Sequence, residues 1–391
     1  MSTQQPKSIL DAVQMHARVC SDSEALSFYD SDKSEWCTLT WSQLWQQVKM
    51  TATTMLSQGV SKGDRVAVWL ENGCPWVLTD LALQLMQCVS VPIHPATLPK
   101  QAALQIARAA CDLLIVDDLT RNDASDLRIT CRILPVGGLL TGSLREPIEH
   151  MPVVPDMQAV QTILFTSGTT GVSKGVLLTY GNLYTNTAAA LERYAFEEDE
   201  VVLNLLPLSH VFARTCDLYV WCLNGHHLIC SQGKEHFSED VRQCRPTHIN
   251  AVPVVFQRLL NAVTDCRSTF TEVTGGRLRH VNAGGAPVPA SLRRAFQTYS
   301  IPMYQGYGLS ETSPVIALEG ASGSNPGSVG RPLGCVEVRI KNGEIQTRGA
   351  SVMKGYLDDS ELTAAVFDGD WLKTGDLGRL NEDGFLYIDG R

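Results

Sequence analysis

The sequence predicts an α/β protein with two doubly wound, mostly parallel sheet subdomains and a small antiparallel β subdomain. From residue 39 to 116, short aliphatic runs alternate with helical patterns of about a dozen residues. The same alternation returns between residues 201 and 298. After Gly323, short apolar runs are separated by Asn-Gly and Asp-Gly pairs, which are typical of hairpins. We therefore expect subdomains at 1–157, 158–323 and 324–391.

The first block has a regular order of expected elements. Residues 39–59 have a helical pattern of apolar side chains, with Thr40 as the N-cap and Gly59 as the stop. The following elements are strands at 65–70, 89–93 and 112–116 and helices at 75–87 and 99–110. We interpret this block as scaffold and assign it no chemistry.

The second block begins with strands at 160–165 and 176–178, which flank a polar loop. A helix at 180–194 and a strand at 201–206 follow. The βα alternation then continues through the segments 228–230, 241–243, 249–252, 255–263, 279–282 and 291–298. In the third block, strands are expected at 337–340, 344–347 and 385–388.

Composition limits the class of protein. The 391 residues are 44% hydrophobic and carry a formal net charge of −9, which favours a soluble cytoplasmic protein without a DNA or RNA partner. The twelve cysteines include no Cys-x-x-Cys pair, so reduced thiols are the better interpretation. We expect neither a signal peptide nor a membrane-spanning segment, because no apolar run approaches about 18 residues.

The polar loop in the second block has the composition of a polyphosphate-binding loop. Glycines allow the backbone to approach the phosphates, while hydroxyls, backbone N–H groups and an ammonium group supply donors. The spacing differs from the P-loop, because a serine precedes the lysine and a strand follows. A surface loop without a ligand is the alternative on composition alone. The loop reads Thr166, Ser167, Gly168, Thr169, Thr170, Gly171, Val172, Ser173, Lys174, Gly175.

Three further segments place polar groups among glycines. Residues 282–287 (NAGGAP) leave room for a flat ring against the backbone, and residues 305–312 (QGYGLSET) offer an aromatic face, hydroxyls and a carboxylate. Residues 373–376 (KTGD) place an acid on an expected tight turn.

Together with the loop, these segments resemble the motifs of the adenylate-forming superfamily of acyl-CoA synthetases, luciferases and peptide-synthetase adenylation domains. The resemblance covers essentially the whole chain with the motifs in the same order. Residues 207–214 (PLSHVFAR) are most similar to medium- and long-chain fatty acyl-CoA synthetases.

The resemblance implies that a carboxylate attacks the α-phosphate of ATP to give an acyl-adenylate, and that coenzyme A then takes the acyl group. It implies Thr166 and Glu311 as Mg²⁺ ligands and His210 as the residue that orients the substrate carboxylate. Catalytic roles fall to His210, Glu311 and Lys174. Binding of the nucleotide is implied for Thr166, Ser167, Gly168, Thr169, Thr170, Gly171, Lys174, Gly285, Ala286, Pro287, Gly306, Tyr307, Gly308, Ser310, Glu311, Asp376 and Arg391.

Specific contacts follow from the same resemblance. Tyr307 is expected to stack on adenine opposite Gly285 and Ala286, Asp376 to bind the ribose diol, and Arg391 to contact ribose or phosphate. The sequence departs from the pattern at Ser173, where proline is usual, and at Ser310, where threonine is commoner.

Several alternatives remain at this point. The acceptor could be the phosphopantetheine of a carrier protein, and the acid could be an aryl acid or an amino acid held by Glu235, Glu239 or Asp240. A non-catalytic nucleotide- or acyl-binding protein is the alternative of another class. His226-His227 has no third ligand at metal spacing and is interpreted as structural.

The sequence stops at Gly390-Arg391, where the resemblance predicts a hinge. We therefore expect that the family's mobile C-terminal domain is absent, and that the chain binds ATP and acid but turns over slowly alone.

Overall fold

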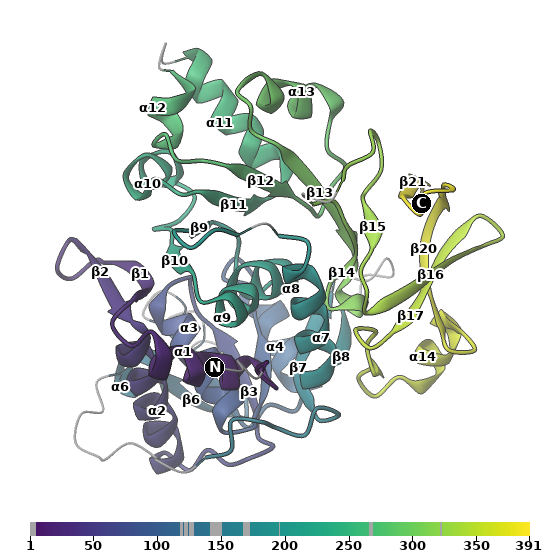
Figure 1. The fold of residues 1–391 in the computed structure, drawn as a ribbon. Helices are drawn as coiled ribbons and strands as arrows, with labels where there is room; N and C mark the ends of the chain where they lie inside the picture. The colour runs from purple at the N-terminus through teal and green to yellow at the C-terminus, as the bar shows by residue number, and fades with distance from the viewer. Residues whose placement is uncertain are drawn as a thin grey trace.

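The computed structural model describes residues 5–117, 120, 124, 129–140, 151–166, 173–194, 196–265, 269–320 and 323–391. Its helices and strands form two large sheets and one small sheet (Figure 1). The expected α/β class, with two mostly parallel sheets and a small antiparallel one, is confirmed.

The seven-stranded sheet has the order β18-β8-β7-β4-β3-β5-β6. Strands β7, β4, β3, β5 and β6 pair in parallel, and β8 and β18 join at one edge as antiparallel strands. The strands are β3 (Arg65–Trp69), β4 (Val89–Pro92), β5 (Leu113–Val116), β6 (Arg132–Pro135), β7 (Val160–Thr166), β8 (Lys174–Thr179) and β18 (Gly355–Tyr356).

The nine-stranded sheet has the order β15-β14-β13-β12-β11-β9-β10-β1-β2. Its centre is parallel, and the hairpins at its two ends are antiparallel. The strands are β1 (Glu24–Asp30), β2 (Glu35–Thr40), β9 (Val201–Asn204), β10 (His227–Cys230), β11 (His248–Ala251), β12 (His280–Ala283), β13 (Met303–Gly308), β14 (Val315–Leu318) and β15 (Arg331–Pro332).

Helices separate and cover the sheets, so that the molecule has alternating α and β layers. The largest core cluster joins side chains of both sheets to the helices between them. These helices are α1 (Ile9–Val19), α2 (Trp41–Ser57), α3 (Cys74–Leu85), α6 (Val136–Leu140), α7 (Tyr180–Leu191), α8 (Val211–Ala213), the π-helix η1 (Arg214–Tyr219) and α9 (Val220–Asn224).

Outer helices complete the layers. A second core cluster lies between the nine-stranded sheet and α10 (Phe237–Cys244), α11 (Pro253–Asp265), α12 (Phe270–Thr274) and α13 (Ala290–Thr298), which Figure 1 shows over that sheet. A third cluster packs α4 (Pro99–Arg108) against the seven-stranded sheet.

The small sheet lies beside the two large ones and contains the C-terminus (Figure 1). It is antiparallel and consists of β16 (Val336–Lys341), β17 (Glu344–Gly349), β19 (Phe367–Asp368), β20 (Trp371–Leu380) and β21 (Leu386–Gly390). Helix α14 (Ser360–Val366) and the 3₁₀ turn η2 (Ser310–Thr312) complete the described elements.

The sheets do not follow the residue ranges expected for the subdomains, because each large sheet contains strands from more than one range. Strands β7 and β8, which flank the polar loop, belong to the seven-stranded sheet, and the β1–β2 hairpin belongs to the nine-stranded one. The division at 157 and 323 stays a prediction about folding units.

Local sequence explains several element boundaries. Thr40 caps α2 through a capping box with Gln43, and Gly59 has a φ of 79° after the helix ends, as expected. The expected turn at Lys373–Asp376 is wrong, because these residues lie inside the ten-residue strand β20. Gly375, with φ 75°, misled the prediction, since the pairing with β17 has an irregular register there.

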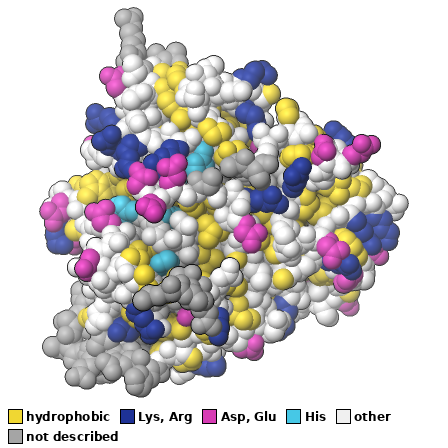
Figure 2. Space-filling view, in the orientation of Figure 1, with side chains coloured by type: hydrophobic (Ala, Val, Ile, Leu, Met, Phe, Trp, Pro, Cys, Tyr) yellow, Lys and Arg dark blue, Asp and Glu magenta, His cyan; other side chains and the backbone are white. Residues whose placement is uncertain are grey.

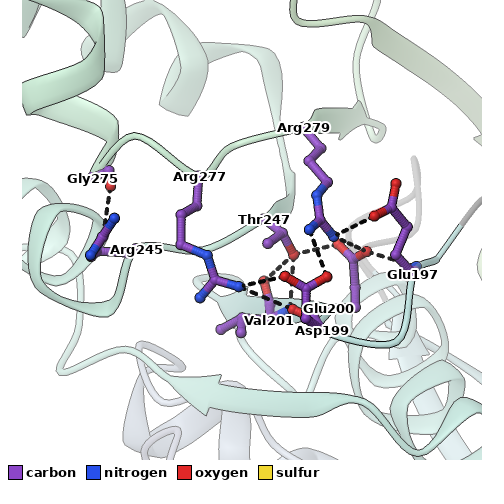
Figure 3. A network of polar contacts seen from close by, with 9 residues as sticks. All are labelled: Glu197, Asp199, Glu200, Val201, Arg245, Thr247, Gly275, Arg277 and Arg279. Carbon is purple, nitrogen blue, oxygen red and sulfur yellow. Dashed lines mark hydrogen bonds and ion pairs between the residues drawn. The ribbon is translucent and has the colours of Figure 1, made fainter.

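A network of charged side chains ties together the amino ends of β9, β11 and β12 (Figure 3). Arg279 contacts Asp199 at 2.6 Å, and Arg277 contacts the same carboxylate at 3.0 Å. Buried Glu200 faces Arg279 at 3.5 Å and accepts a hydrogen bond from Thr247. Functional sites on such sheets form at the carboxyl ends of the strands, so we interpret this network as structural.

Three histidines form a second buried group, the histidine cluster His226, His248 and His280. The rings of His248 and His280 are 4.3 Å apart, and each member has one ring nitrogen without a hydrogen-bond partner. Burial lowers the pKa to about 3 for His226 and about 4 for His280, and well below the usual value for His248. All three are neutral in the folded state at neutral pH.

Three further observations concern the charges on the surface, the hydropathy of the helices and the state of the cysteines. Figure 2 shows acidic and basic side chains intermingled on the face turned to the viewer. Among the described residues, no helix has both the length and the hydropathy needed to cross a bilayer. The eleven cysteines that the structure describes are all free, as expected.

Candidate functional site

Three cavities meet at Ser310 in the 3₁₀ turn after β13. The wide cavity, of about 820 Å³, is lined by His94, Arg108 and Thr166 among others. The narrow cavity, of about 260 Å³, contains Gly285 and Tyr307 in its wall. The charged cavity, of about 620 Å³, is lined by Lys174, Glu311, Glu344, Lys373 and Arg391 among others. Ser310 lines all three, which makes it the point where ligands from three directions would converge.

The charged cavity contains Lys174, Glu311 and Arg391, which the sequence singled out, whereas Asp376 lines none of the three cavities. Thr166 ends β7 and pairs directly with Lys174, the first residue of β8. The Lys174 ammonium lies 5.4 Å from the centre of the Tyr356 ring, whose hydroxyl donates to Glu311 at 2.8 Å. Burial, and then the Glu311 carboxylate, raise the pKa of Tyr356, so the hydroxyl stays a donor. Tyr356 thereby orients Glu311 while leaving carboxylate oxygen lone pairs for a cation.

The residues fit a magnesium ion bound together with phosphate. The described residues contain no group of three or more His, Cys, Asp or Glu side chains arranged around one metal position. Mg²⁺ is usually held by one or two protein oxygens, with phosphates and water filling its remaining positions. The Thr166 hydroxyl and Glu311 carboxylate, which share the charged cavity, match that requirement.

Asp376 and Arg391 complete one side of this region. Asp376 accepts a hydrogen bond from the Tyr307 hydroxyl at 2.8 Å, and the Arg391 guanidinium lies 3.5 Å from its other oxygen. Burial raises the pKa of Tyr307 well above its usual value, which keeps the phenol protonated. The aromatic face of Tyr307 and the Asp376 carboxylate are therefore adjacent, as a nucleoside would need for its base and its ribose.

Glycines allow the backbone to pack closely around Tyr307. A Cβ at Gly308 would lie 1.8 Å from the Pro314 carbonyl oxygen, and a Cβ at Gly284 would lie 2.9 Å from the Phe212 ring. Gly285 has a φ of 74°, a conformation that favours glycine. Gly285, Gly306, Gly308 and Tyr307 all line the narrow cavity. Ala286 and Pro287 are exposed in the turn that follows and line none of the three cavities.

His210 lies where the wide and narrow cavities adjoin. Its Nδ1 accepts a hydrogen bond from the Phe212 backbone N–H at 3.3 Å, which caps α8 and leaves the ring proton on Nε2. Burial, and then repulsion from His94, lower the pKa of His210, so the ring is neutral. A neutral imidazole with a free Nε2–H can donate to a carboxylate or carbonyl oxygen at the cavity junction.

An asparagine clamp holds the segment that leads to His210. The Asn72 amide donates to the Leu206 carbonyl at 2.7 Å and to Asn204 at 3.0 Å, and it accepts from the Leu208 N–H at 2.8 Å. The sequence assigned no chemistry to the first block, yet Asn72 follows β3 in that block. A lone asparagine in a loop gave no signal of this role.

A buried ion pair holds the segment that follows His210. Arg214 pairs with Asp80 of α3 and donates to Thr162 of β7 at 2.9 Å and to Tyr219 at 2.7 Å. The side chains of Arg214 and Asp80 are 0% and 1% exposed. Sequence reasoning missed this pair, because the two residues are far apart in the chain. The one available signal was the pair of charged residues Arg214 and Asp217 in a helical stretch that is otherwise mostly apolar.

Some expected residues are outside the described part of the chain. Ser167, Gly168, Thr169, Thr170 and Gly171 fall among them, so the structure describes only the two ends of the polar loop. His94 and Arg108, to which the sequence assigned nothing, line the wide cavity with His210. His226 and His227 lie outside all three cavities.

The two mostly parallel sheets, the small antiparallel sheet and the three cavities that adjoin at Ser310 define an α/β protein with a composite binding site. The model of the AMP-binding enzyme family matches residues 13–357, and the chain belongs to this family. The expected resemblance is thereby confirmed.

Relatives with established names are about equally similar to the chain. It is 28% identical over 365 residues to the 2-succinylbenzoate–CoA ligase of Bacillus pumilus, covering 89% of this chain and 72% of that protein. It is also 28% identical over 428 residues to a long-chain-fatty-acid–CoA ligase of Mycobacterium bovis, covering 91% and 70%.

Solved structures agree with the fold. The O-succinylbenzoate coenzyme A synthetase of Bacillus subtilis in complex with ATP and magnesium ion superposes with a TM-score of 0.83 at 26% identity, covering 96% of this chain and 78% of that one. The N-terminal domain of FACL13 from Mycobacterium tuberculosis has a TM-score of 0.87 at 22% identity, covering 98% and 100%, and supports the fold alone.

Proposed function

We propose that this protein activates a carboxylic acid with ATP and Mg²⁺ to an acyl-adenylate and transfers the acyl group to coenzyme A. The observation that carries the proposal is the meeting of three cavities at Ser310, one charged, one narrow and largely apolar, and one wide. These match a polyphosphate, an adenine ring beside the tail of an acid, and an incoming thiol. Family membership and the relatives' names support the same reaction class.

In the first step, a carboxylate oxygen of the acid attacks the α-phosphorus of ATP. The bond from that phosphorus to the bridging oxygen breaks, and pyrophosphate leaves with the electron pair of that bond. In the second step, the coenzyme A thiol loses its proton to solvent and its sulfur attacks the acyl carbon. The bond from the acyl carbon to the phosphate oxygen then breaks, and AMP leaves with its electron pair. Mg²⁺ supplies Lewis-acid charge at the phosphates.

We assign roles to the residues of this chain. Glu311 and Thr166 hold the cation, and Lys174 neutralises phosphate charge. His210 donates its Nε2 proton in a hydrogen bond that orients the acid carboxylate. Tyr307 and Asp376 bind the adenosine, with Arg391 beside them. The undescribed loop residues from Ser167 to Gly171 are proposed to contact the phosphates.

The class of acid is a narrower proposal. A cavity of roughly 150 Å³ holds one benzene ring, so the 260 Å³ of the narrow cavity, which the adenine also borders at Tyr307 and Gly285, suits only a compact acid, either a single-ring aryl acid or a medium-chain fatty acid. We therefore propose both classes of acid as substrates. Among the medium- and long-chain fatty acids that the sequence predicted, we favour those with the shorter chains. An amino acid is disfavoured, because Asp240 is engaged by Ser231 and Gln232 and, like Glu235 and Glu239, lines none of the three cavities.

Replacing Glu311 by alanine tests the site. We expect Glu311→Ala to weaken Mg·ATP binding by at least about tenfold, since it removes a ligand of the cation. Binding of the acid should change far less. Isothermal titration with Mg·ATP and with hexanoate measures both, and Glu337→Ala, an exposed carboxylate paired with Arg348, is the matched control. An equal loss of both affinities would contradict the assigned role.

A further inference from the structure

The inner end of the narrow cavity has a different chemistry from its mouth. The mouth is at His210, Val211 and Ser310, which also line the wide cavity. Tyr194, Cys216 and Asn282 line only the narrow cavity. Asn282 precedes Gly284 by two residues at the end of β12, which corresponds to roughly 7 Å along the strand. The Tyr194 side chain interacts with those of Cys216 and Asn282, so the three lie together at a distance from the mouth, and we call this group the inner end.

No charge is available at this inner end. Among the described residues that line the narrow cavity there is no Lys, Arg, Asp or Glu. Burial raises the pKa of Cys216 to about 12 and that of Tyr194 well above its usual value, so both stay protonated at neutral pH. The inner end therefore presents a phenol, a thiol and an amide, all uncharged.

The carboxyl group of Asp217, the residue after Cys216, increases the free-energy penalty for placing a negative charge at the inner end. Asp217 follows Cys216, is fully buried, and accepts hydrogen bonds from Asn250 at 2.6 Å and Asn204 at 2.7 Å. Burial raises its pKa to about 7. A ligand carboxylate at the inner end would be desolvated without a cation and close to a second acid.

The inner end does have hydrogen-bonding capacity to spare. The amide oxygen of Asn282 has no partner, although the residue is only 3% exposed. Its amide nitrogen lies 3.4 Å from His248 Nε2, which already faces the Asn250 oxygen at 3.0 Å. A neutral imidazole has a single N–H, so it cannot satisfy both asparagines fully. A buried amide whose hydrogen bonds are incomplete is stabilised when a neutral polar group of a ligand bonds to it.

We propose that the acid substrate is a compact monocarboxylic acid whose far end is uncharged and carries a hydrogen-bonding group, such as a hydroxyl or carbonyl, that contacts Tyr194 and Asn282. The inference rests on the proposed function and narrows its substrate class. It separates this chain from its 2-succinylbenzoate-activating relatives, because that acid carries a second carboxylate.

Matched acids test the proposal. The first set is hexanoate, 6-hydroxyhexanoate and adipate, which differ only at the far end. The second pair is 4-oxo-4-phenylbutanoate and 2-succinylbenzoate, which differ by one ring carboxylate. Pyrophosphate release with Mg·ATP gives kcat/KM for each acid, and calorimetry in the presence of AMP gives the affinities independently of turnover.

We expect each monocarboxylate to exceed its dicarboxylate partner by about 100-fold in affinity or kcat/KM, and 6-hydroxyhexanoate to exceed hexanoate. Tyr194→Phe should reduce the ratio of 6-hydroxyhexanoate to hexanoate by about tenfold. The control Tyr299→Phe, which alters an exposed phenol stacked on Phe270, should leave that ratio unchanged.

The outcomes separate the two proposals. A preference for adipate or 2-succinylbenzoate would overturn the inference and leave the proposed function standing. An unchanged acid ratio in Tyr194→Phe would overturn the contact with Tyr194. If no acid is bound and none releases pyrophosphate, the proposed function fails and the inference fails with it.

Discussion

The buried pair of Arg214 and Asp80 gives a sharp prediction for stability. Replacing Arg214 by methionine removes the partner of a carboxylate that is 1% exposed. Breaking such a pair typically costs 3–5 kcal/mol, because one charge stays buried without compensation. Asp80 keeps hydrogen bonds from Tyr219 at 3.0 Å and Gln84 at 2.9 Å. We therefore expect Arg214→Met to lower the free energy of unfolding by about 3 kcal/mol, the lower end of that range.

The double variant of Arg214 and Asp80 should be less destabilised than either single variant. In Arg214→Met/Asp80→Leu no charge is left, and the remaining loss is the hydrogen bonds of Thr162 and Tyr219, at about 1 kcal/mol each. We expect a total cost of about 2 kcal/mol, against about 3 kcal/mol or more for Asp80→Leu alone, which leaves a bare guanidinium. The interaction energy of the cycle is then at least about 4 kcal/mol and favourable.

Urea denaturation followed by tryptophan fluorescence measures all four states of this cycle. Lys33→Met is the control, since its partner Asp30 lies 2.9 Å away in a pair where the lysine is 60% exposed. This variant should leave the unfolding midpoint unchanged. If the double variant costs the sum of the two single ones, the two side chains do not interact, and the reasoning from the buried pair is refuted.

Three further outcomes are expected. The histidine cluster is neutral in the folded state, whereas the same three residues bind protons below about pH 6.5 in the unfolded state. The unfolding free energy should therefore fall as the pH is lowered, by up to about 4 kcal/mol per pH unit near pH 5. Asp217, with its raised pKa of about 7, opposes this by about 1.4 kcal/mol per unit, so the histidine effect should dominate, and a flat stability profile in urea melts from pH 7 to 5 would contradict the assignment of the histidine cluster. Gly308→Ala should abolish nucleotide binding in calorimetry, because its Cβ would overlap a backbone carbonyl at 1.8 Å; normal binding would show that the strand can shift. Asn72→Ala should lower kcat of adenylation more than it raises the KM for ATP, and an effect on the ATP KM alone would count against the clamp.

The alternating α/β order was predictable because its signal is local. The helix capped at Thr40 and the strands at 65–70 and 112–116 differ from the structure by only a few residues at their ends. Periodicity and caps depend on neighbouring residues, which the sequence displays directly. The strand through Lys373 and Asp376 was missed because Gly375 is typical of turns, whereas pairing with β17 decided the outcome.

Much of the candidate site was also predictable, since its residues stand in compact motifs. Lys174, Glu311 and Arg391 share one cavity, and His210 lies at the junction of two others. Sequence could not supply the partners that orient them. Tyr356 reaches Glu311 across 45 residues and Asn72 reaches Leu208 across 136, and no local pattern reports contacts at such separations.

These long-range partners explain how two sheets can form one site. Arg214 follows His210 by four residues, and its guanidinium donates to Thr162, which precedes Thr166 by four residues on β7. On the other side of His210, Asn72 fixes the backbone at Leu206 and Leu208 from the end of β3. The histidine at the cavity junction is therefore tied from both sides to the sheet that carries the polar loop. A shift of one sheet relative to the other would have to break buried hydrogen bonds, so the distance between His210 and Thr166, the last residue of β7, is fixed by the fold before any ligand arrives.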